Sequence, residues 1–421
     1  MPPVSTLQRR LGTTDAVIIG LGSMVGAGIF IALAPAAAAA GSWLLVGLAV
    51  AAVVAYCNAT SSARLAALYP QSGGTYVYGR ERLGDFWGYL AGWSFVVGKT
   101  ASCAAMALTV GSYVWPAYAH AVAVAAVVAL TAVNYRGIQK SALLTRMVVA
   151  VVLAVLAAVV VIVATSGHTD ADHLRLGHGT VLGVLQAAGL LFFAFAGYAR
   201  IATLGEEVRD PARTIPRAIP LALGLALVVY AAVAVTVLAV LGPHGLATAA
   251  APLADAVRAA GAGGFEPVVR VGAAVAALGS LLSLILGVSR TTLAMARGHH
   301  LPVGLAAVHP RFGVPHRAEV AVGVVVAALA AVADVRGVIG FSSFAVLVYY
   351  AVANASAWTL GGRRIIPAVG LIGCVVLSVA LPLPAVLSGA GVLALGAVIY
   401  AIRRLRYDRD SHDLDTGRKP G

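Results

Sequence analysis

Apolar runs of about 18 to 25 residues, each long enough to cross a bilayer, alternate with short polar segments along the whole chain. Lipid offers no partners for backbone polar groups, so we expect each run to be helical. A transmembrane β-barrel would instead show short segments of alternating hydrophobicity, and these tracts of Ala, Val and Leu are continuous. The pattern therefore predicts an all-α integral membrane protein.

The runs predict twelve transmembrane helices. They lie near 14–38, 42–66, 86–113, 118–134, 142–165, 180–203, 216–241, 268–295, 318–334, 338–360, 366–381 and 384–403. Lys and Arg residues gather in every second connection and at both ends, whereas the other connections contain few of them. Cytoplasmic loops carry such an excess of positive charge. We therefore expect a multi-pass protein of the cytoplasmic membrane with both termini in the cytoplasm.

Composition supports this class and removes one alternative. Of the 421 residues, 60% are hydrophobic and only 11% are charged, which is too little charge for the surface of a soluble protein. A net charge of +13 is also typical of nucleic-acid binding, but the basic residues lie where the positive-inside rule places them. The expected partner is the lipid bilayer and not a nucleic acid. The three cysteines lie inside apolar runs and are expected to be packed like small hydrophobic residues.

The first span contains an unusual stretch, "GLGSMVGAGIF" from Gly20 to Phe30, with four glycines in eleven residues. Each glycine costs a helix about 1 kcal/mol relative to alanine, and irregular backbone at membrane depth occurs only where it lines a cavity or binds something. An unwound turn exposes N–H groups that suit a carboxylate and carbonyls that suit an ammonium or a metal ion. The alternative is close helix packing, because Gly22 and Gly26 also form a small-residue contact pattern.

The sixth span shifts the balance toward a broken helix, because it places Gly197 inside an aromatic cluster, "LLFFAFAGYAR". Spans one and six are the first members of two sets of five. Five is odd, so the two sets run in opposite directions through the membrane. Interrupted segments at corresponding positions of inverted halves indicate a transporter binding site.

Several motifs resemble those of the amino acid–polyamine–organocation permeases. They are "GSMVGAGIF" (22–30), "YPQSGGTYVY" (69–78), "NYRGIQKSA" (134–142), "FFAFAGYARIATLGEEVRDPARTIPRAI" (192–219) and "MARGHHLP" (295–302). The resemblance spans nearly the whole chain. It implies the leucine-transporter type of fold, a 5+5 inverted repeat plus two C-terminal helices with helices 1 and 6 broken, and secondary active transport of amino acids or related amines. The implied division is 1–13 tail, 14–165 first repeat, 166–179 external loop, 180–360 second repeat, 366–403 helices 11 and 12, and 404–421 tail.

The resemblance also implies which residues bind substrate. Mostly backbone contacts are expected from Ser23, Met24, Val25, Gly26, Ala27, Gly28, Phe195, Ala196, Gly197 and Tyr198, and Phe193 aligns with the family's aromatic lid. An isolated Phe on a membrane helix more often faces lipid or packs. Ser280 and Ser283 in span eight are candidates for a cation site, although membrane serines commonly bond to their own helix backbone.

The chain departs from the family pattern at a coupling lysine. Many proton-coupled relatives carry a lysine eighteen residues after the Asn of the "NYRG" motif, and here that position is Val152. Lys99 instead lies near the middle of span three, where a buried ammonium is by default functional. We expect Lys99 to supply the missing cation, either by exchanging a proton or as a fixed charge. The alternative is a lysine that faces a water-filled crevice and has no coupling role.

Arg200, two residues after Tyr198, is a second unusual cation. It either belongs to an inner gate with acids near the cytoplasmic face, or it makes the cavity positive so that the substrate supplies a negative charge. The gate is the preferred interpretation. Asp15, Glu206 and Glu207 are the candidate acids, and Arg290 is expected to pair with the same acids.

The sequence therefore predicts a permease that imports a small amino acid by alternating access, coupled to protons rather than to sodium. No cofactor and no metal are expected. Amino acid exchange is the nearest alternative, and a transport-inactive sensor is a second. An intramembrane enzyme would need paired catalytic groups at membrane depth, and the spans offer neither an Asp pair nor a His cluster.

Overall fold

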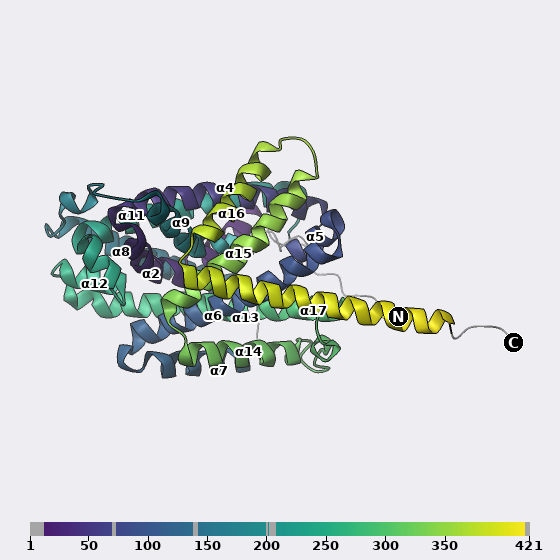
Figure 1. The fold of residues 1–421 in the computed structure, drawn as a ribbon. Helices are drawn as coiled ribbons and strands as arrows, with labels where there is room; N and C mark the ends of the chain where they lie inside the picture. Colours follow the sequence, from purple (N-terminus) through teal and green to yellow (C-terminus); the bar gives the residue numbers. More distant parts are fainter. Residues whose placement is uncertain (1–11, 70–72, 138–141, 199–200, 202–207, 417–421) are drawn as a thin grey trace.

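The computed structural model describes residues 12–69, 73–137, 142–198, 201 and 208–416, and nearly all of these residues lie in helices (Figure 1). The first half contains α1 (Thr13–Met24), α2 (Ala27–Ile31), α3 (Leu33–Ala40), η1 (Gly41–Trp43), α4 (Leu44–Leu68), α5 (Thr75–Leu83), α6 (Asp85–Val114), η2 (Pro116–Tyr118), α7 (Ala119–Tyr135), α8 (Ala142–Thr165) and η3 (Ala171–Leu174). The second half contains α9 (Val181–Phe195), η4 (Ala196–Tyr198), α11 (Pro211–Thr248), α12 (Pro252–Ala259), η5 (Gly263–Phe265), α13 (Glu266–Arg297), η6 (Val303–Ala306), α14 (His316–Val332), α15 (Val335–Trp358), α16 (Ile365–Ala380) and α17 (Leu383–Thr416).

Ten helical segments among the described residues are long and apolar enough to cross a membrane. The all-helical membrane class predicted from the hydrophobic runs is therefore confirmed. At the expected ninth and eleventh spans the chain is also helical, but α14 has 17 residues and α16 has 16, so both fall short of the 18-residue length. The count of twelve spans and the inverted repeat stay predictions. The last helix, α17, continues to Thr416 beyond the expected boundary at 403.

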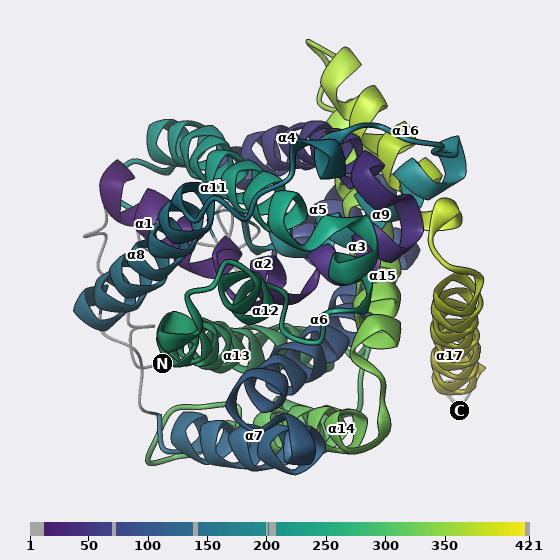
Figure 2. The same ribbon diagram turned by 90° about the vertical axis from the view of Figure 1, so that its left-hand side faces the viewer.

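The apolar outer faces of the bundle are those that a lipid environment requires. In the most apolar 18-residue stretch of the span that contains α7, only 11% of the residues are buried. In the corresponding stretch of α17 the buried share is 17%. Val128 on α7 is 59% exposed and Leu395 on α17 is 55% exposed. Figure 2 shows both helices at the periphery of the bundle. Apolar side chains on an outer surface have a favourable solvent in lipid tails but not in water.

The centre of the bundle is formed by α2, α6, α9 and α13 with their neighbours. Helix α6 contacts both α13 and α15, and α9 contacts α3, α4 and α2. The three cysteines are buried in helices, as predicted. The two interrupted helices of the sequence analysis meet in this core, and they position the site.

Candidate functional site

The first predicted break is present between α1 and α2. Helix α1 ends at Met24, α2 begins at Ala27, and the residues between them have non-helical torsions, with φ −77° and ψ 55° at Val25 and φ −107° and ψ −144° at Gly26. The N–H of Gly26 bonds to the carbonyl of Met24 at 2.7 Å, which closes a tight turn in place of a helical bond. Backbone groups on both sides of this turn therefore lack their regular helical partners.

The second predicted break follows α9, where the helix tightens into the 3₁₀ turn η4. The Tyr230 hydroxyl on α11 joins the two breaks. Its oxygen lies 2.6 Å from the carbonyl oxygen of Met24 and 2.9 Å from that of Ala194. One buried hydroxyl therefore donates to carbonyls of both interrupted helices. A buried carbonyl that has no donor lowers the stability of the fold by about 1 to 3 kcal/mol.

The two interrupted helices touch backbone to backbone, which explains two of the glycines. A Cβ atom on Gly197 would overlap the carbonyl of Ser23 and would lie 2.7 Å from the nitrogen of Met24. A Cβ atom on Gly28 would lie 2.7 Å from the Cα of Ala194. Real Cβ contacts are longer than 3.0 Å, so only glycine permits this approach at both positions.

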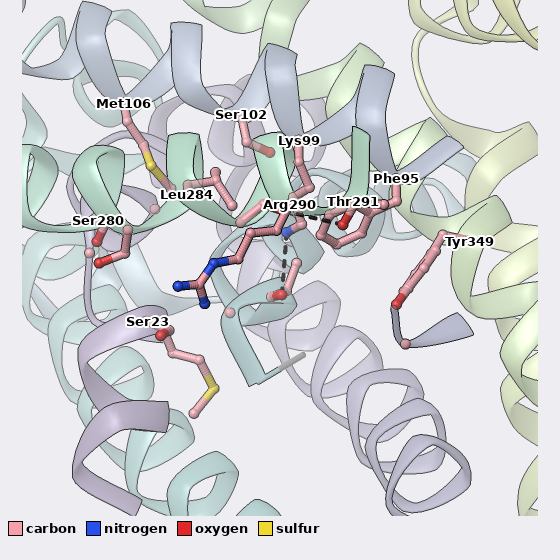
Figure 3. A pocket seen from close by; sticks show the side chains of 18 of the residues that line it. Ser23, Phe95, Lys99, Ser102, Met106, Ser280, Leu284, Arg290, Thr291 and Tyr349 are labelled. Atoms are coloured by element: carbon pink, nitrogen blue, oxygen red, sulfur yellow. Dashed lines mark hydrogen bonds between the residues drawn. The ribbon is translucent and has the colours of Figure 1, made fainter. Parts of the chain in front are cut away.

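A cavity of about 410 Å³ lies at this junction. Its wall is built from the broken segments together with α6, α13 and α15, and Figure 3 shows several of the side chains that line it. The wall residues are Gly22, Ser23, Met24, Gly26, Ala27, Gly28, Gly73, Gly74, Phe95, Lys99, Ser102, Met106, Phe193, Ala194, Ala196, Gly197, Ser280, Ser283, Leu284, Gly287, Arg290, Thr291, Leu293, Ala294, Arg297 and Tyr349. A cavity of this volume is in the range of small-molecule sites.

The structure brings most of the predicted substrate contacts to this cavity. Those in its wall are Ser23, Met24, Gly26, Ala27, Gly28, Phe193, Ala196 and Gly197. The side chains of Val25, Phe195 and Tyr198 are instead buried in packing outside the described wall. The Phe195 ring lies 5.1 Å from that of Tyr230, and the Tyr198 ring lies 5.1 Å from that of Tyr350. Phe193 is 8% exposed and lies in the wall, and its role as a lid stays a prediction.

Lys99 reaches the second break from α6. Its side chain is 7% exposed, and Nζ donates to the carbonyl oxygen of Ala196 in η4 at 3.3 Å. Three further wall residues lie on the same helix: Phe95 is four positions before Lys99, Ser102 is three positions after it, and Met106 is seven positions after it. Residues at these spacings share one face of a helix. These three residues were not among the predicted site residues. The helical spacing around Lys99 could have identified them.

The two candidate serines of α13 behave differently. Ser283 donates to the carbonyl of Gly279 in its own helix at 3.1 Å, which is the ordinary behaviour of a membrane serine. The Ser280 hydroxyl is buried and has no hydrogen-bond partner in the described structure, and it faces the first break directly against Gly26. A cation role for this pair therefore stays a prediction, with Ser280 the better placed of the two.

The predicted gate residues are only partly described. Arg290 lies in the cavity wall, whereas Arg200, Glu206 and Glu207 lie outside the described residues. Asp15 forms its ion pair with Arg146 on α8. The expectation that Arg290 pairs with Asp15 is therefore wrong in this structure, because the loop-proximal arginine of α8 occupies that carboxylate.

The cavity extends from the breaks toward one end of the bundle. Gly73 and Gly74, just before α5, and Arg297, in the last turn of α13, line it there. The opposite end contains α12 (Figure 1), and polar contacts link its helices. There the Tyr113 hydroxyl donates to the carbonyl of Phe30 at 2.9 Å, and Glu266 of α13 pairs with arginines of α12 and α13 at 2.6 and 2.7 Å.

One further titratable residue escaped the sequence analysis. Glu319, in the first turn of α14, is completely buried, and neither of its carboxyl oxygens has a hydrogen-bond partner among the described residues. Arg290 on α13 is close enough for a charge interaction with it, but no hydrogen bond offsets the burial of the carboxylate, so the neutral acid is the expected form. It does not line the cavity described above.

An all-helical membrane bundle with a central cavity between two interrupted helices is the architecture of a membrane transporter. Residues 11–402 match the family profile described as amino acid permease. An uncharacterised transporter of Mycobacterium tuberculosis (strain ATCC 25618 / H37Rv) is 74% identical over 417 residues, which cover 98% of this chain and 94% of that protein. The chain belongs to the amino acid permease family, a family of transporters and not of enzymes.

More distant relatives differ in what their names say they carry. A branched-chain amino acid permease of Bacillus subtilis (strain 168) is 28% identical over 342 residues, which cover 74% of this chain and 72% of the relative. A methylthioribose transporter of the same organism is 27% identical over 355 residues, which cover 77% and 75%. The family is therefore shown, while the cargo of this chain has to be argued from its own site.

Proposed function

We propose that this protein is a secondary transporter that imports a small amino acid across the cytoplasmic membrane by alternating access. One observation carries the proposal: both interrupted helices meet at a single cavity, and their backbones touch at Gly197 and Gly28. The N–H groups that begin α2 suit a carboxylate, and the carbonyls that end α1 and α9 suit an ammonium. One site between the two breaks thus offers partners for both ends of an α-amino acid.

The shape of the cavity supports a state that faces the cytoplasm. Its open end lies beside α5 and Arg297, and these segments adjoin the basic connections that the positive-inside rule assigns to the cytoplasm. The end that contains α12 is the external end in this orientation. Closing the α5 end and opening the α12 end would expose the same breaks to the outside, as alternating access requires. The proposal includes twelve spans, the inverted repeat and cytoplasmic termini.

We assign proton coupling to Lys99. Its ammonium is buried beside the carbonyl of Ala196, and a charged side chain at membrane depth is costly unless it is paired or releases its proton. The contact joins α6 to the second break, so a change in the charge of Lys99 acts directly on the segment that binds substrate. Ser280 is retained as the candidate contact for a cation, and Arg290, Arg200, Glu206 and Glu207 as the candidate gate, while Asp15 pairs with Arg146.

Reconstituted protein in liposomes tests this proposal. Vesicles preloaded with one unlabelled amino acid are assayed for uptake of the same labelled amino acid, first without any gradient and then with an imposed pH gradient. We expect exchange without a gradient for a subset of amino acids, and accumulation when the outside is acidic. Accumulation should persist when choline replaces sodium. Exchange without any proton-driven accumulation would indicate an obligate exchanger, and no exchange with folded protein would contradict transport.

A further inference from the structure

The charged side chains of the cavity wall all have the same sign. They are Lys99 near the centre, Arg290 on the inner half of α13, and Arg297 at the mouth. No Asp or Glu occurs among the described wall residues. The cavity is therefore electropositive over its described length, and a bound molecule experiences this charge at short range because the walls are apolar and poorly screened.

Lys99 occupies one of the carbonyls at the second break, that of Ala196. The carbonyl of Ala196 ends α9, which is the end of a helix that attracts cations, and the Lys99 ammonium already donates to it. An ammonium has three donor hydrogens, and the described structure gives Lys99 this one acceptor. Among the described residues two N–H groups of this buried ammonium therefore lack a partner, which favours a negatively charged ligand next to it.

Arg290 provides a second donor group in the same cavity. Its side chain is exposed to the cavity and points into it from α13 (Figure 3). Within the described residues it forms no hydrogen bond and no ion pair, and the one acid with which a charge interaction is described, Glu319 on α14, is expected to be neutral. The hydroxyls of Ser23 and Ser102 are already engaged, at 2.9 Å with the carbonyl of Ile19 and at 2.6 Å with Ser342. Among the described wall side chains, the Ser280 hydroxyl is an unengaged neutral donor, and the unengaged charged donors include those of Lys99 and Arg290. A guanidinium binds carboxylates through two parallel bonds.

We propose that the transported amino acid is acidic, and that its side-chain carboxylate binds between Lys99 and Arg290. This inference rests on the proposed function and names its substrate class. A neutral amino acid is a zwitterion with no net charge, so it would leave the cations of the wall uncompensated. A basic amino acid would add to their charge. Aspartate or glutamate brings one net negative charge together with the α-carboxylate and α-ammonium that the two breaks accommodate.

Isosteric pairs of amino acids test the proposal on the unaltered protein. Counterflow in liposomes is measured with glutamate against glutamine and with aspartate against asparagine, which differ in charge and hardly in shape. Arginine is included as the cationic probe. We expect at least one acid to be exchanged ten times faster than its amide, and arginine not at all. Equal or faster exchange of the amide or of arginine overturns the substrate class while leaving the proposed transport intact. No exchange of any amino acid contradicts both.

A pair of variants then tests the role of Lys99. Lys99→Met keeps the length of the side chain and removes its charge, and we expect the acid-to-amide ratio to fall at least tenfold. The matched control is Arg175→Gln, which removes an 81% exposed cation from the segment before α9 and should leave the ratio unchanged. If Lys99→Met does not give monodisperse protein, Arg290→Gln replaces it, with the same expected fall. An unchanged ratio in a folded variant overturns the assignment of the carboxylate to these cations.

Discussion

Replacing Gly197 by Ala tests whether the contact between the two breaks is what shapes the binding site. The added Cβ would overlap the Ser23 carbonyl and approach the Met24 nitrogen to 2.7 Å, against the 3.4–4 Å of ordinary contacts. The end of α1 must therefore move away from η4 by roughly 1 Å. Overpacking of this kind costs about 1 to 3 kcal/mol, and a displacement of about 1 Å in a positioning group lowers rates by about 100-fold.

The assay combines counterflow with thermal unfolding in detergent. We expect Gly197→Ala to lose at least tenfold in counterflow rate and to unfold at a lower temperature than the parent. Gly224→Ala is the matched control, because apart from the adjoining backbone of its own helix no atom lies within 4 Å of its added Cβ, and the residue is exposed on α11. Alanine there should stabilise the helix by up to about 1 kcal/mol and leave transport unchanged. Parental rate and stability in Gly197→Ala would refute the reasoning.

Two further substitutions test other parts of the structure. Tyr230→Phe removes the hydroxyl that contacts the carbonyls of both breaks, so we expect the free energy of unfolding to fall by about 1 to 3 kcal/mol. The control Tyr118→Phe changes a side chain that is 60% exposed and should leave the free energy of unfolding unchanged. Equal effects of the two substitutions would exclude a special role for the Tyr230 hydroxyl. His300 lies in the connection after α13, and its Nδ1 is 2.9 Å from the hydroxyl oxygen of Tyr76 on α5. Burial lowers the pKa of His300. The neutral form is thus favoured in the folded state, and stability should be full above about pH 6.5 and fall as the pH drops through the lowered pKa. His300→Gln should flatten this fall in unfolding temperature, and a slope as steep as that of the parent would contradict it.

The fold class was predictable from the sequence because each span is a long apolar run that needs no partner to be recognised. The two breaks were predictable for a similar reason, since Gly26 and Gly197 stand out inside such runs. Lys99 was identified because a charge inside an apolar run is itself a signal. These features are local, so the sequence contains them directly.

What the sequence could not supply was the direction of each side chain. Val25, Phe195 and Tyr198 were selected with their neighbours, yet their side chains pack away from the cavity because alternate positions of a turn face different helices. Tyr230 and Glu319 are single polar residues in or beside apolar runs. Only the three-dimensional packing shows which carbonyls accept from the Tyr230 hydroxyl, and that the Glu319 carboxyl has no hydrogen-bond partner among the described residues. Pairings between distant loops, such as Asp15 with Arg146, are likewise set by packing.

The central claim is that an amino acid binds between the two breaks. A structure determined with the amino acid that gives the fastest counterflow tests it most directly. We expect ligand density with its α-carboxylate near the N–H groups of Ala27 and Gly28 and its α-ammonium near the carbonyls around Phe195. Density at another place in the molecule, with the cavity between α1 and η4 unoccupied at saturating ligand, would contradict this claim.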